Sequence, residues 1–238
     1  MLRDKPPEPD DRPLFYGRRR GKALRSQRQD GYDSVIPWAE IQELKFPPDG
    51  AKIDPRTLFD FPVTDVWLEI GFGNGEQLMH QALNNPTIGM IGCEPFINGV
   101  AALCRDMKEK DVKNIRIFQD DARLLMARLA EKSIGRCFIL NSDPWPKTRH
   151  QRRRVVQTET LDTLHRLMVK GAELRLSSDD PGLNAWQIEK PYLHGGYEWL
   201  ANSAADWRTR PADMLGTRYQ NKGATQGRPT MFFNFKTI

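Results

Sequence analysis

A short apolar run that leads into three closely spaced glycines is the feature that most limits how this chain can fold. Residues 66–70 (Val-Trp-Leu-Glu-Ile) have the length and composition of a buried strand. Gly71, Gly73 and Gly75 follow, and a helix is expected from Glu76. A strand, a glycine turn and a helix together bring backbone close to a nucleotide-like ligand. Because Glu76 stands where a dinucleotide fingerprint has its third glycine, the turn disfavours a pyrophosphate and tolerates a cationic ligand.

Acidic side chains around this turn indicate which ligand it could hold. Glu94 closes the apolar run over residues 88–94, and an acid at the end of the second strand can bind a ribose. Together, Glu69, Glu76 and Glu94 favour an adenosyl ligand without phosphates, and we expect S-adenosylmethionine, whose sulfonium is positive. A tight strand–helix turn with no ligand remains the alternative.

Strand-like and helical segments alternate from residue 66 onward, which predicts an α/β fold with a mostly parallel sheet and helices on both faces. We expect strands over residues 66–70, 88–94, 115–118, 136–140 and 172–176, and helices over 76–83, 97–110, 122–129 and 154–168. Segments 198–201 and 230–236 predict a C-terminal antiparallel strand pair. Acids follow three of the strands, at Asp121, Asp143 and Asp179. Ligands of such sheets bind outside the carboxyl ends of the strands, so these acids should face one crevice.

Positive charge is concentrated in two stretches of a chain whose net charge is +5. Residues 18–28 hold six Lys and Arg, residues 147–154 hold five, and neither stretch contains an acid. Localised charge of this kind indicates a polyanionic partner, although a solvated charged face remains the alternative. We expect residues 1–34 to form a disordered or extended basic arm and residues 35–238 to form a single catalytic domain.

The remaining composition places the protein in a reducing compartment. Cys93, Cys104 and Cys137 are odd in number, lie in apolar segments and lack metal-ligand spacing, so we expect buried thiols and no metal site. No apolar segment follows Met1 as in a signal peptide, and no apolar run has the length of a membrane span. These features predict a soluble, cytoplasmic protein with no membrane partner. They indicate no obligate protein partner and leave the oligomeric state open.

A second candidate functional segment begins at Asp143. Pro144 and Pro146 flank Trp145, and the basic stretch follows directly. Proline restricts the backbone on both sides of the ring, which would hold the indole beside the Asp143 carboxylate. A carboxylate, an aromatic plane and several cations suit a nucleobase on a phosphate chain, although Trp145 could instead cover the core.

These segments resemble bacterial tRNA (guanine-N7)-methyltransferases over about residues 14 to 238. The resemblance is carried by residues 15–21 (Phe-Tyr-Gly-Arg-Arg-Arg-Gly), 69–75 (Glu-Ile-Gly-Phe-Gly-Asn-Gly), 92–96 (Gly-Cys-Glu-Pro-Phe), 121–122 (Asp-Ala), 143–150 (Asp-Pro-Trp-Pro-Lys-Thr-Arg-His) and 217–219 (Thr-Arg-Tyr). The resemblance implies a Rossmann-like class I methyltransferase fold. It also implies methyl transfer from S-adenosylmethionine to N7 of guanosine in the variable loop of tRNA.

The resemblance assigns roles to particular residues, which complete the expected site. Asp143 is the expected catalytic residue. The expected cofactor-binding residues are Glu69, Gly71, Gly73, Gly75, Glu94, Asp121 and Asp143. The expected substrate-binding residues are Lys147, Asp179, Thr217, Arg218, Tyr219 and Gln220. The basic stretches supply the expected contacts to tRNA phosphates, namely Arg18, Arg19, Arg20, Lys22, Arg149, Arg152 and Arg153.

The chain departs from the family pattern at three places. Ser142 stands where the family usually has Pro, Asp180 and Pro181 replace an aromatic residue and Glu, and Gln220 replaces Glu. Two alternatives therefore stay open. One is a tRNA-binding protein that keeps the methyltransferase fold with impaired catalysis, and the other is a methyltransferase for another RNA base or for protein.

Overall fold

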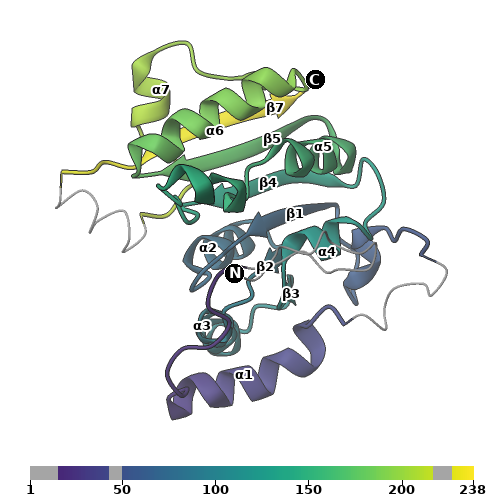
Figure 1. The fold of residues 1–238 in the computed structure, drawn as a ribbon. Coiled ribbons are helices and arrows are strands. Elements are labelled where there is room, and N and C mark those ends of the chain that lie inside the picture. Colours follow the sequence, from purple (N-terminus) through teal and green to yellow (C-terminus); the bar gives the residue numbers. More distant parts are fainter. Residues whose placement is uncertain (1–15, 43–49, 217–226) are drawn as a thin grey trace, which may run out of the picture.

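A seven-stranded sheet forms the centre of the computed structural model, which describes residues 16–42, 50–216 and 227–238 (Figure 1). The strands are β1 (Asp65–Ile70), β2 (Ile88–Cys93), β3 (Ile115–Phe118), β4 (Ile134–Leu140), β5 (Met168–Ser178), β6 (Tyr197–Trp199) and β7 (Met231–Thr237). Their order is β3-β2-β1-β4-β5-β7-β6. Strands β1 to β5 run parallel, and β7 lies antiparallel between β5 and β6. The mostly parallel sheet and its antiparallel C-terminal pair are confirmed.

The order of the strands determines where a ligand site can form. Strand β1 pairs with β2 on one side and with β4 on the other, so the chain winds outward from β1 in both directions. In a sheet of this kind the crevice lies where the winding reverses, at the carboxyl ends of the central strands.

Helices surround the sheet. They are α1 (Ser26–Ala39), α2 (Glu76–Asn84), α3 (Ile97–Glu109), α4 (Ala122–Met126), α5 (Thr158–Leu167), α6 (Pro181–His194) and α7 (Ala204–Arg208), with 3-10 turns η2 (Pro55–Leu58) and η3 (Thr148–Arg153). Figure 1 shows α1 beside α3 at the β3 end of the sheet, and α6 and α7 at the end formed by β6 and β7. No helix within the described residues is long and apolar enough to cross a membrane.

Two hydrophobic clusters occupy the two faces of the sheet. Successive residues of a strand point to opposite faces. Accordingly, Leu68 and Ile91 pack in one cluster with residues of α4 and α5, while Trp67 and Met90 pack in the other with residues of α1, α2 and α3. Helices therefore cover both faces, as expected from the alternation of strands and helices.

Helix α1 differs from the sequence-based expectation. Residues 26–34 were expected to belong to a disordered or extended arm, and this is wrong because they are helical. Gly31, Val35 and Ala39 lie four residues apart and form the buried face of α1. Because Gly31 has no side chain, α1 can approach the backbone of α3 closely. A Cβ at this position would lie 2.5 Å from the Arg105 Cα.

Several element boundaries also differ from the prediction. Helix α5 begins at Thr158 instead of residue 154, because residues 148–153 form η3 and residues 154–157 connect η3 to α5. Helices α6 and α7 were not predicted. In α6, Asp180 caps the first turn by accepting a hydrogen bond from the Leu183 N–H at 2.8 Å, and Pro181 occupies the first position.

Candidate active site

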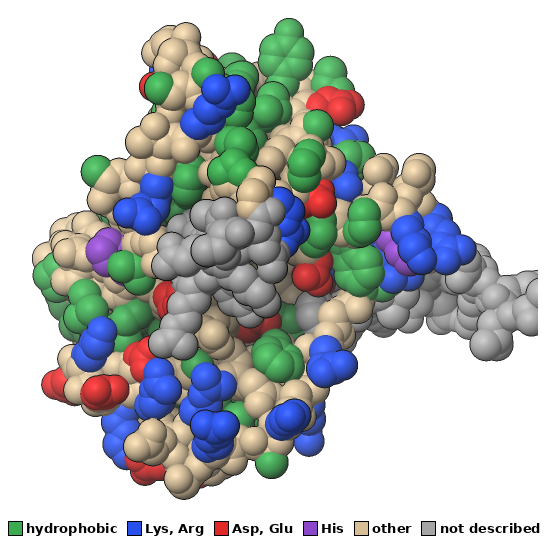
Figure 2. Space-filling model, turned by 90° about the vertical axis from the view of Figure 1, so that its left-hand side faces the viewer, with side chains coloured by type: hydrophobic (Ala, Val, Ile, Leu, Met, Phe, Trp, Pro, Cys, Tyr) green, Lys and Arg blue, Asp and Glu red, His purple; other side chains and the backbone are tan. Residues whose placement is uncertain are grey.

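A cavity of about 470 Å³ opens at the carboxyl ends of β1, β2 and β4. The expected residues that line it are Glu69, Gly71, Gly73, Glu94, Asp121, Asp143, Arg18 and Arg153. Glu69, Glu94, Asp121 and Asp143 therefore meet in one crevice, as expected from their places at strand ends, whereas Asp179, after β5, does not line it. In Figure 2, Lys and Arg side chains gather at the bottom and at the right of one face of the molecule, and several Asp and Glu side chains lie between them.

The glycine turn after β1 leaves open space in the cavity. Gly71 and Gly73 adopt φ angles of +74° and +58°, which L side chains rarely adopt. Apart from the two chain neighbours of each glycine, no heavy atom of the described residues lies within 4 Å of the position that a Cβ would take there. Gly75 also has positive φ, but its Cβ would meet Leu103 at 2.7 Å. The first two glycines thus expose backbone to the cavity, and the third lets α2 pack against α3.

Glu94 is fixed at the end of β2 by two backbone groups. Its Oε2 accepts a hydrogen bond from the Gly73 N–H at 2.9 Å, and its Oε1 accepts one from the Phe96 N–H at 2.9 Å. Burial raises the pKa of Glu94, and the two backbone donors act in the opposite direction. Each oxygen can accept a further hydrogen bond, as required to bind a pair of ribose hydroxyls.

Glu69 is the most deeply buried acid of the cavity, with 3% of its surface exposed. Its Oε2 is buried and has no hydrogen-bond partner among the described residues. Burial raises the pKa of Glu69 to about 8, and the nearby Glu94 charge adds to the effect. A cationic ligand next to Glu69 would favour its charged form.

Asp121 begins α4 and is held by the first turn of that helix. Its carboxylate accepts hydrogen bonds from the Arg123 backbone N–H at 3.0 Å and from Arg123 Nη2 at 2.5 Å. These contacts to Asp121 raise the pKa of Arg123. The neighbouring Asp120 also lines the cavity and binds Arg19 Nη2 at 2.5 Å.

The loop after β4 carries Asp143 on a constrained backbone. Trp145 has a φ of +41°, and the buried Arg154 donates a hydrogen bond from Nε to the Pro144 carbonyl at 2.8 Å. Asp143 itself is exposed to solvent at the cavity wall. Arg154 therefore supports the loop from inside the protein, although the sequence placed it in a basic stretch.

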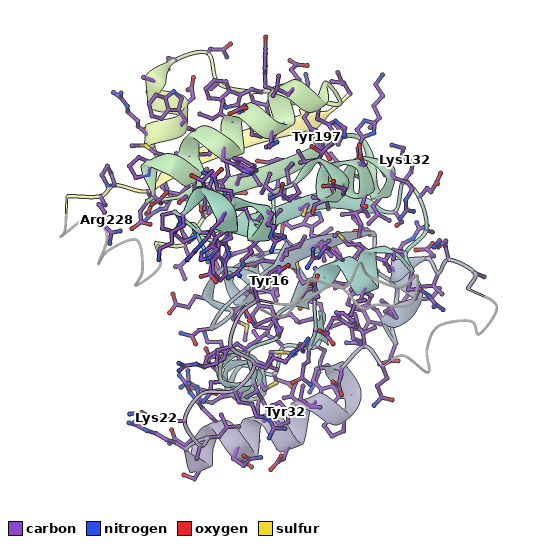
Figure 3. All side chains as sticks on the ribbon, in the orientation of Figure 1. Tyr16, Lys22, Tyr32, Lys132, Tyr197 and Arg228 are labelled. Atoms are coloured by element: carbon purple, nitrogen blue, oxygen red, sulfur yellow. The ribbon has the colours of Figure 1, made fainter. Side chains whose placement is uncertain are left out.

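The N-terminal arm meets this loop over the cavity. The Arg153 guanidinium lies 4.6 Å from the ring centroid of Tyr16 and 5.0 Å from that of Trp145. The Gly21 N–H donates to Asn98 Oδ1 at 2.8 Å, and Asn98 Nδ2 donates to the Lys22 carbonyl at 2.7 Å. These bonds fasten the extended arm to the start of α3. Figure 3 shows Tyr16 near the middle of the molecule and Lys22 at the edge, next to α1.

Comparison with known proteins identifies the family. Residues 64–233 match the family described as "Putative methyltransferase". The tRNA (guanine-N(7)-)-methyltransferase of Rhodospirillum rubrum is 42% identical over 97% of this chain and 90% of its own length. The enzyme of the same name from Agrobacterium fabrum is 41% identical, over 93% of this chain and 94% of its own length. The chain belongs to the tRNA (guanine-N7)-methyltransferase family.

A solved structure supports the fold of this family member. The 16S rRNA methyltransferase KamB aligns with 77% of the chain and 91% of its own residues, with a TM-score of 0.54. Because the sequences are only 15% identical, this likeness concerns the fold alone. The Rossmann-like methyltransferase fold predicted from the sequence is confirmed.

Several other expected site residues within the described part of the chain do not line the cavity. Lys147 is exposed directly before η3, and Arg149 and Arg152 are exposed within η3. Arg152 also borders a second cavity, near α4 and α5. Asp179 follows β5 and lies 3.6 Å from Arg228 Nη1. Arg20 is exposed. Thr217, Arg218, Tyr219 and Gln220 lie outside the described residues.

Several further cavity residues were assigned no role from the sequence, among them Tyr16, Gln77, Asp120 and Arg123. Tyr16 belongs to the segment 15–21 that carries the family resemblance, so the sequence could have indicated it. Asp120 and Arg123 lie beside the expected Asp121 in the sequence, whereas Gln77 depends on a contact with Leu215, far away in the chain.

Proposed function

We propose that this protein transfers a methyl group from S-adenosylmethionine to N7 of a guanosine in the variable loop of tRNA. The observation that carries the proposal is the identity of about 40% to curated tRNA (guanine-N(7)-)-methyltransferases over nearly the whole chain. The shared region includes the arm and the loop after β4 as well as the cavity.

The cavity residues fit S-adenosylmethionine. The open space beside Gly71 and Gly73 accommodates a ligand against the backbone, and the unpartnered Glu69 oxygen suits a ligand that carries positive charge. Glu94 would hold the ribose hydroxyls, and Asp121 would lie at the adenosine end, beside α4. When bound, the cofactor supplies a methyl group made electrophilic by its sulfonium.

Asp143 is proposed to act on the guanine. N7 has an in-plane lone pair and no proton, so the reaction needs no base to free the nucleophile. It needs the reacting atoms held in line at about 3–3.5 Å. The product ring is cationic, and a carboxylate nearby stabilises that charge as it develops. Asp143 therefore orients the base and stabilises the ring, and Trp145 borders the same space.

The exposed cations are proposed to bind the tRNA backbone. Arg18, Arg20, Lys147, Arg149 and Arg152 are exposed around the cavity or on the loop beyond it. N7 lies in the deep major groove of an RNA helix, which side chains read poorly. The target nucleotide is therefore expected to turn out of its tertiary contacts into the cavity.

The direct test uses purified protein, labelled S-adenosylmethionine and unmodified tRNA, followed by chemical cleavage at N7-methylguanosine. Cleavage at one variable-loop position is the expected result. Tight tRNA binding without methyl transfer would indicate a tRNA-binding protein without this activity. Methylation of a different base would show that the proposed N7 specificity is wrong.

A further inference from the structure

Gln77, in the first turn of α2, presents a buried hydrogen-bond donor without a partner. The residue lines the cavity and is 3% exposed. Its Nε2 is buried and has no hydrogen-bond partner among the described residues. Buried side-chain amides are normally satisfied, so an unsatisfied donor on a residue that lines the cavity indicates a ligand acceptor.

The other half of the Gln77 amide is already engaged. Its Oε1 accepts a hydrogen bond from the Leu215 N–H at 2.9 Å. Because a backbone N–H can only donate, this contact fixes which end of the amide is oxygen and leaves the NH₂ end for the ligand.

The segment that holds Gln77 is itself firmly attached. Asp213 accepts hydrogen bonds from Arg175 Nη1 at 2.8 Å and from Arg136 Nη1 at 2.9 Å. The Asp213 carbonyl accepts a third from Gln81 Nε2 at 2.6 Å, one turn further along α2. These two arginines lower the pKa of Asp213 against the opposing effect of burial, so the carboxylate stays charged at neutral pH. Residues 213–215 thus tie β4 and β5 to the start of α2.

The position of Gln77 suggests which group it binds. Under the function proposed above, Glu94 and Asp121 hold the adenosine part of the cofactor. The amino-acid part would then lie toward the glycine turn and the first turn of α2, whose residues line the same cavity. The amino-acid end is a zwitterion: Glu76, in the same turn and also lining the cavity, suits its ammonium group, and the Gln77 NH₂ is a good donor to its carboxylate.

We propose that Gln77 donates a hydrogen bond from Nε2 to the carboxylate at the amino-acid end of the cofactor, and that Asp213 is the positioning residue that holds Gln77 in place. A guanine oxygen of the RNA could offer the same acceptor chemistry. The experiment separates the two sources.

The test compares two ligands that differ only at the amino-acid end. S-adenosylhomocysteine has the carboxylate, and 5′-methylthioadenosine lacks the whole amino-acid group. Gln77→Glu keeps the acceptor for the Leu215 N–H but replaces the donor with an oxygen. We expect this variant to weaken S-adenosylhomocysteine about tenfold or more, with 5′-methylthioadenosine changed less than about twofold. Binding is measured by titration calorimetry on the full chain.

Two further variants keep the test independent of folding defects. Asp213→Asn lies outside the cavity lining and should weaken S-adenosylhomocysteine selectively, though by less than Gln77→Glu. The matched control is Gln187→Met in α6, another buried glutamine whose amide atoms lack described partners, but which does not line the cavity. It should leave both ligands unchanged.

The outcomes are distinct. An equal loss for both ligands, or no loss for either, would overturn the inference. An unchanged cofactor affinity with a raised KM for tRNA would assign the acceptor to the RNA instead. If the wild-type protein binds neither ligand, the proposed function fails first, and the inference fails with it.

Discussion

Glu69 is a carboxyl that lies buried in the wall of the cavity. Burial within the sheet raises the pKa of Glu69 from 4.5 to about 8. Its Oε2 has no hydrogen-bond partner among the described residues. A group whose pKa is higher in the folded state stabilises the fold fully below its unfolded pKa, and this contribution is lost as the pH rises through the folded value. The ligand-free protein should therefore lose stability between about pH 5 and pH 8.

Glu69→Gln should remove this pH dependence. Between about pH 6 and pH 9, the free energy of unfolding of the wild type should fall by roughly 3 kcal/mol more than that of the variant. Urea denaturation at both pH values measures the difference. Glu189→Gln, an exposed position on α6, is the control and should follow the wild type. Parallel pH curves for wild type and Glu69→Gln would show that Glu69 is already charged without a ligand.

Asp143→Asn tests the proposed catalytic residue. The variant keeps the shape of the side chain and loses its charge, so turnover should fall by about 10²–10³-fold if the carboxylate stabilises the cationic product ring. Cofactor affinity should stay within severalfold, because Asp143 is exposed at the cavity wall. Single-turnover methylation and S-adenosylhomocysteine titration separate the two effects. If Asp143→Asn instead loses cofactor binding but keeps its methylation rate, Asp143 acts only in binding the cofactor.

At the scale of elements, the regular strands were predictable and several helices were not. Strands β1 to β4 are short, mostly apolar runs, and the burial of their apolar residues follows from composition, whereas the burial of Glu69 and Arg116 does not. Helix α1 buries small residues and contains Gly31 and Pro37, so its sequence shows no apolar stripe. In the sequence, Asp180 and Pro181 are departures from the family motif. In the structure, Asp180 is the N-cap of α6 and Pro181 is its first residue.

The docking of α1 on α3 should depend on Gly31. A Cβ at this position would lie 2.5 Å from the Arg105 Cα and 2.7 Å from its N, and backbone atoms cannot rotate away. Gly31→Ala should destabilise the protein by about 1–3 kcal/mol or release α1 from the domain. Thermal unfolding and hydrogen exchange over residues 26–39 measure both effects. Gln27→Ala, at an exposed position of α1, should be neutral, and a neutral Gly31→Ala would contradict this packing.

Across the whole molecule, the sequence predicted the main acids of the cavity but not the contacts between distant segments. Glu69, Glu94, Asp121 and Asp143 share one property, which is that each lies at or next to the end of a parallel strand. Chain order is enough to bring such residues together. Gln77 is held by Leu215, far away in the sequence, so its proposed role could be inferred only from the three-dimensional structure.

The exposed cations should make tRNA binding strongly dependent on salt. Each phosphate contact contributes a slope of about 0.7–0.9 to the decrease of log affinity with log salt. Arg149→Ala and Arg152→Ala should each lower the slope by about that amount and leave S-adenosylhomocysteine affinity unchanged. Filter binding over a salt series measures the slope. Lys170→Ala, exposed near the start of β5, is the control, and a slope that no arginine substitution changes would exclude these phosphate contacts.

The two outer strands of the sheet have a consequence for solubility at high concentration. Strand β3 has four residues and β6 has three, and the Ile41 N–H covers part of the β3 edge by donating to the Ile117 carbonyl at 2.8 Å. A long uncovered edge would act as a template on which other chains could add strands. Edge strands this short offer few backbone groups to which a strand of another chain could bind. The protein should therefore resist amyloid-like aggregation even when it is concentrated for RNA titrations.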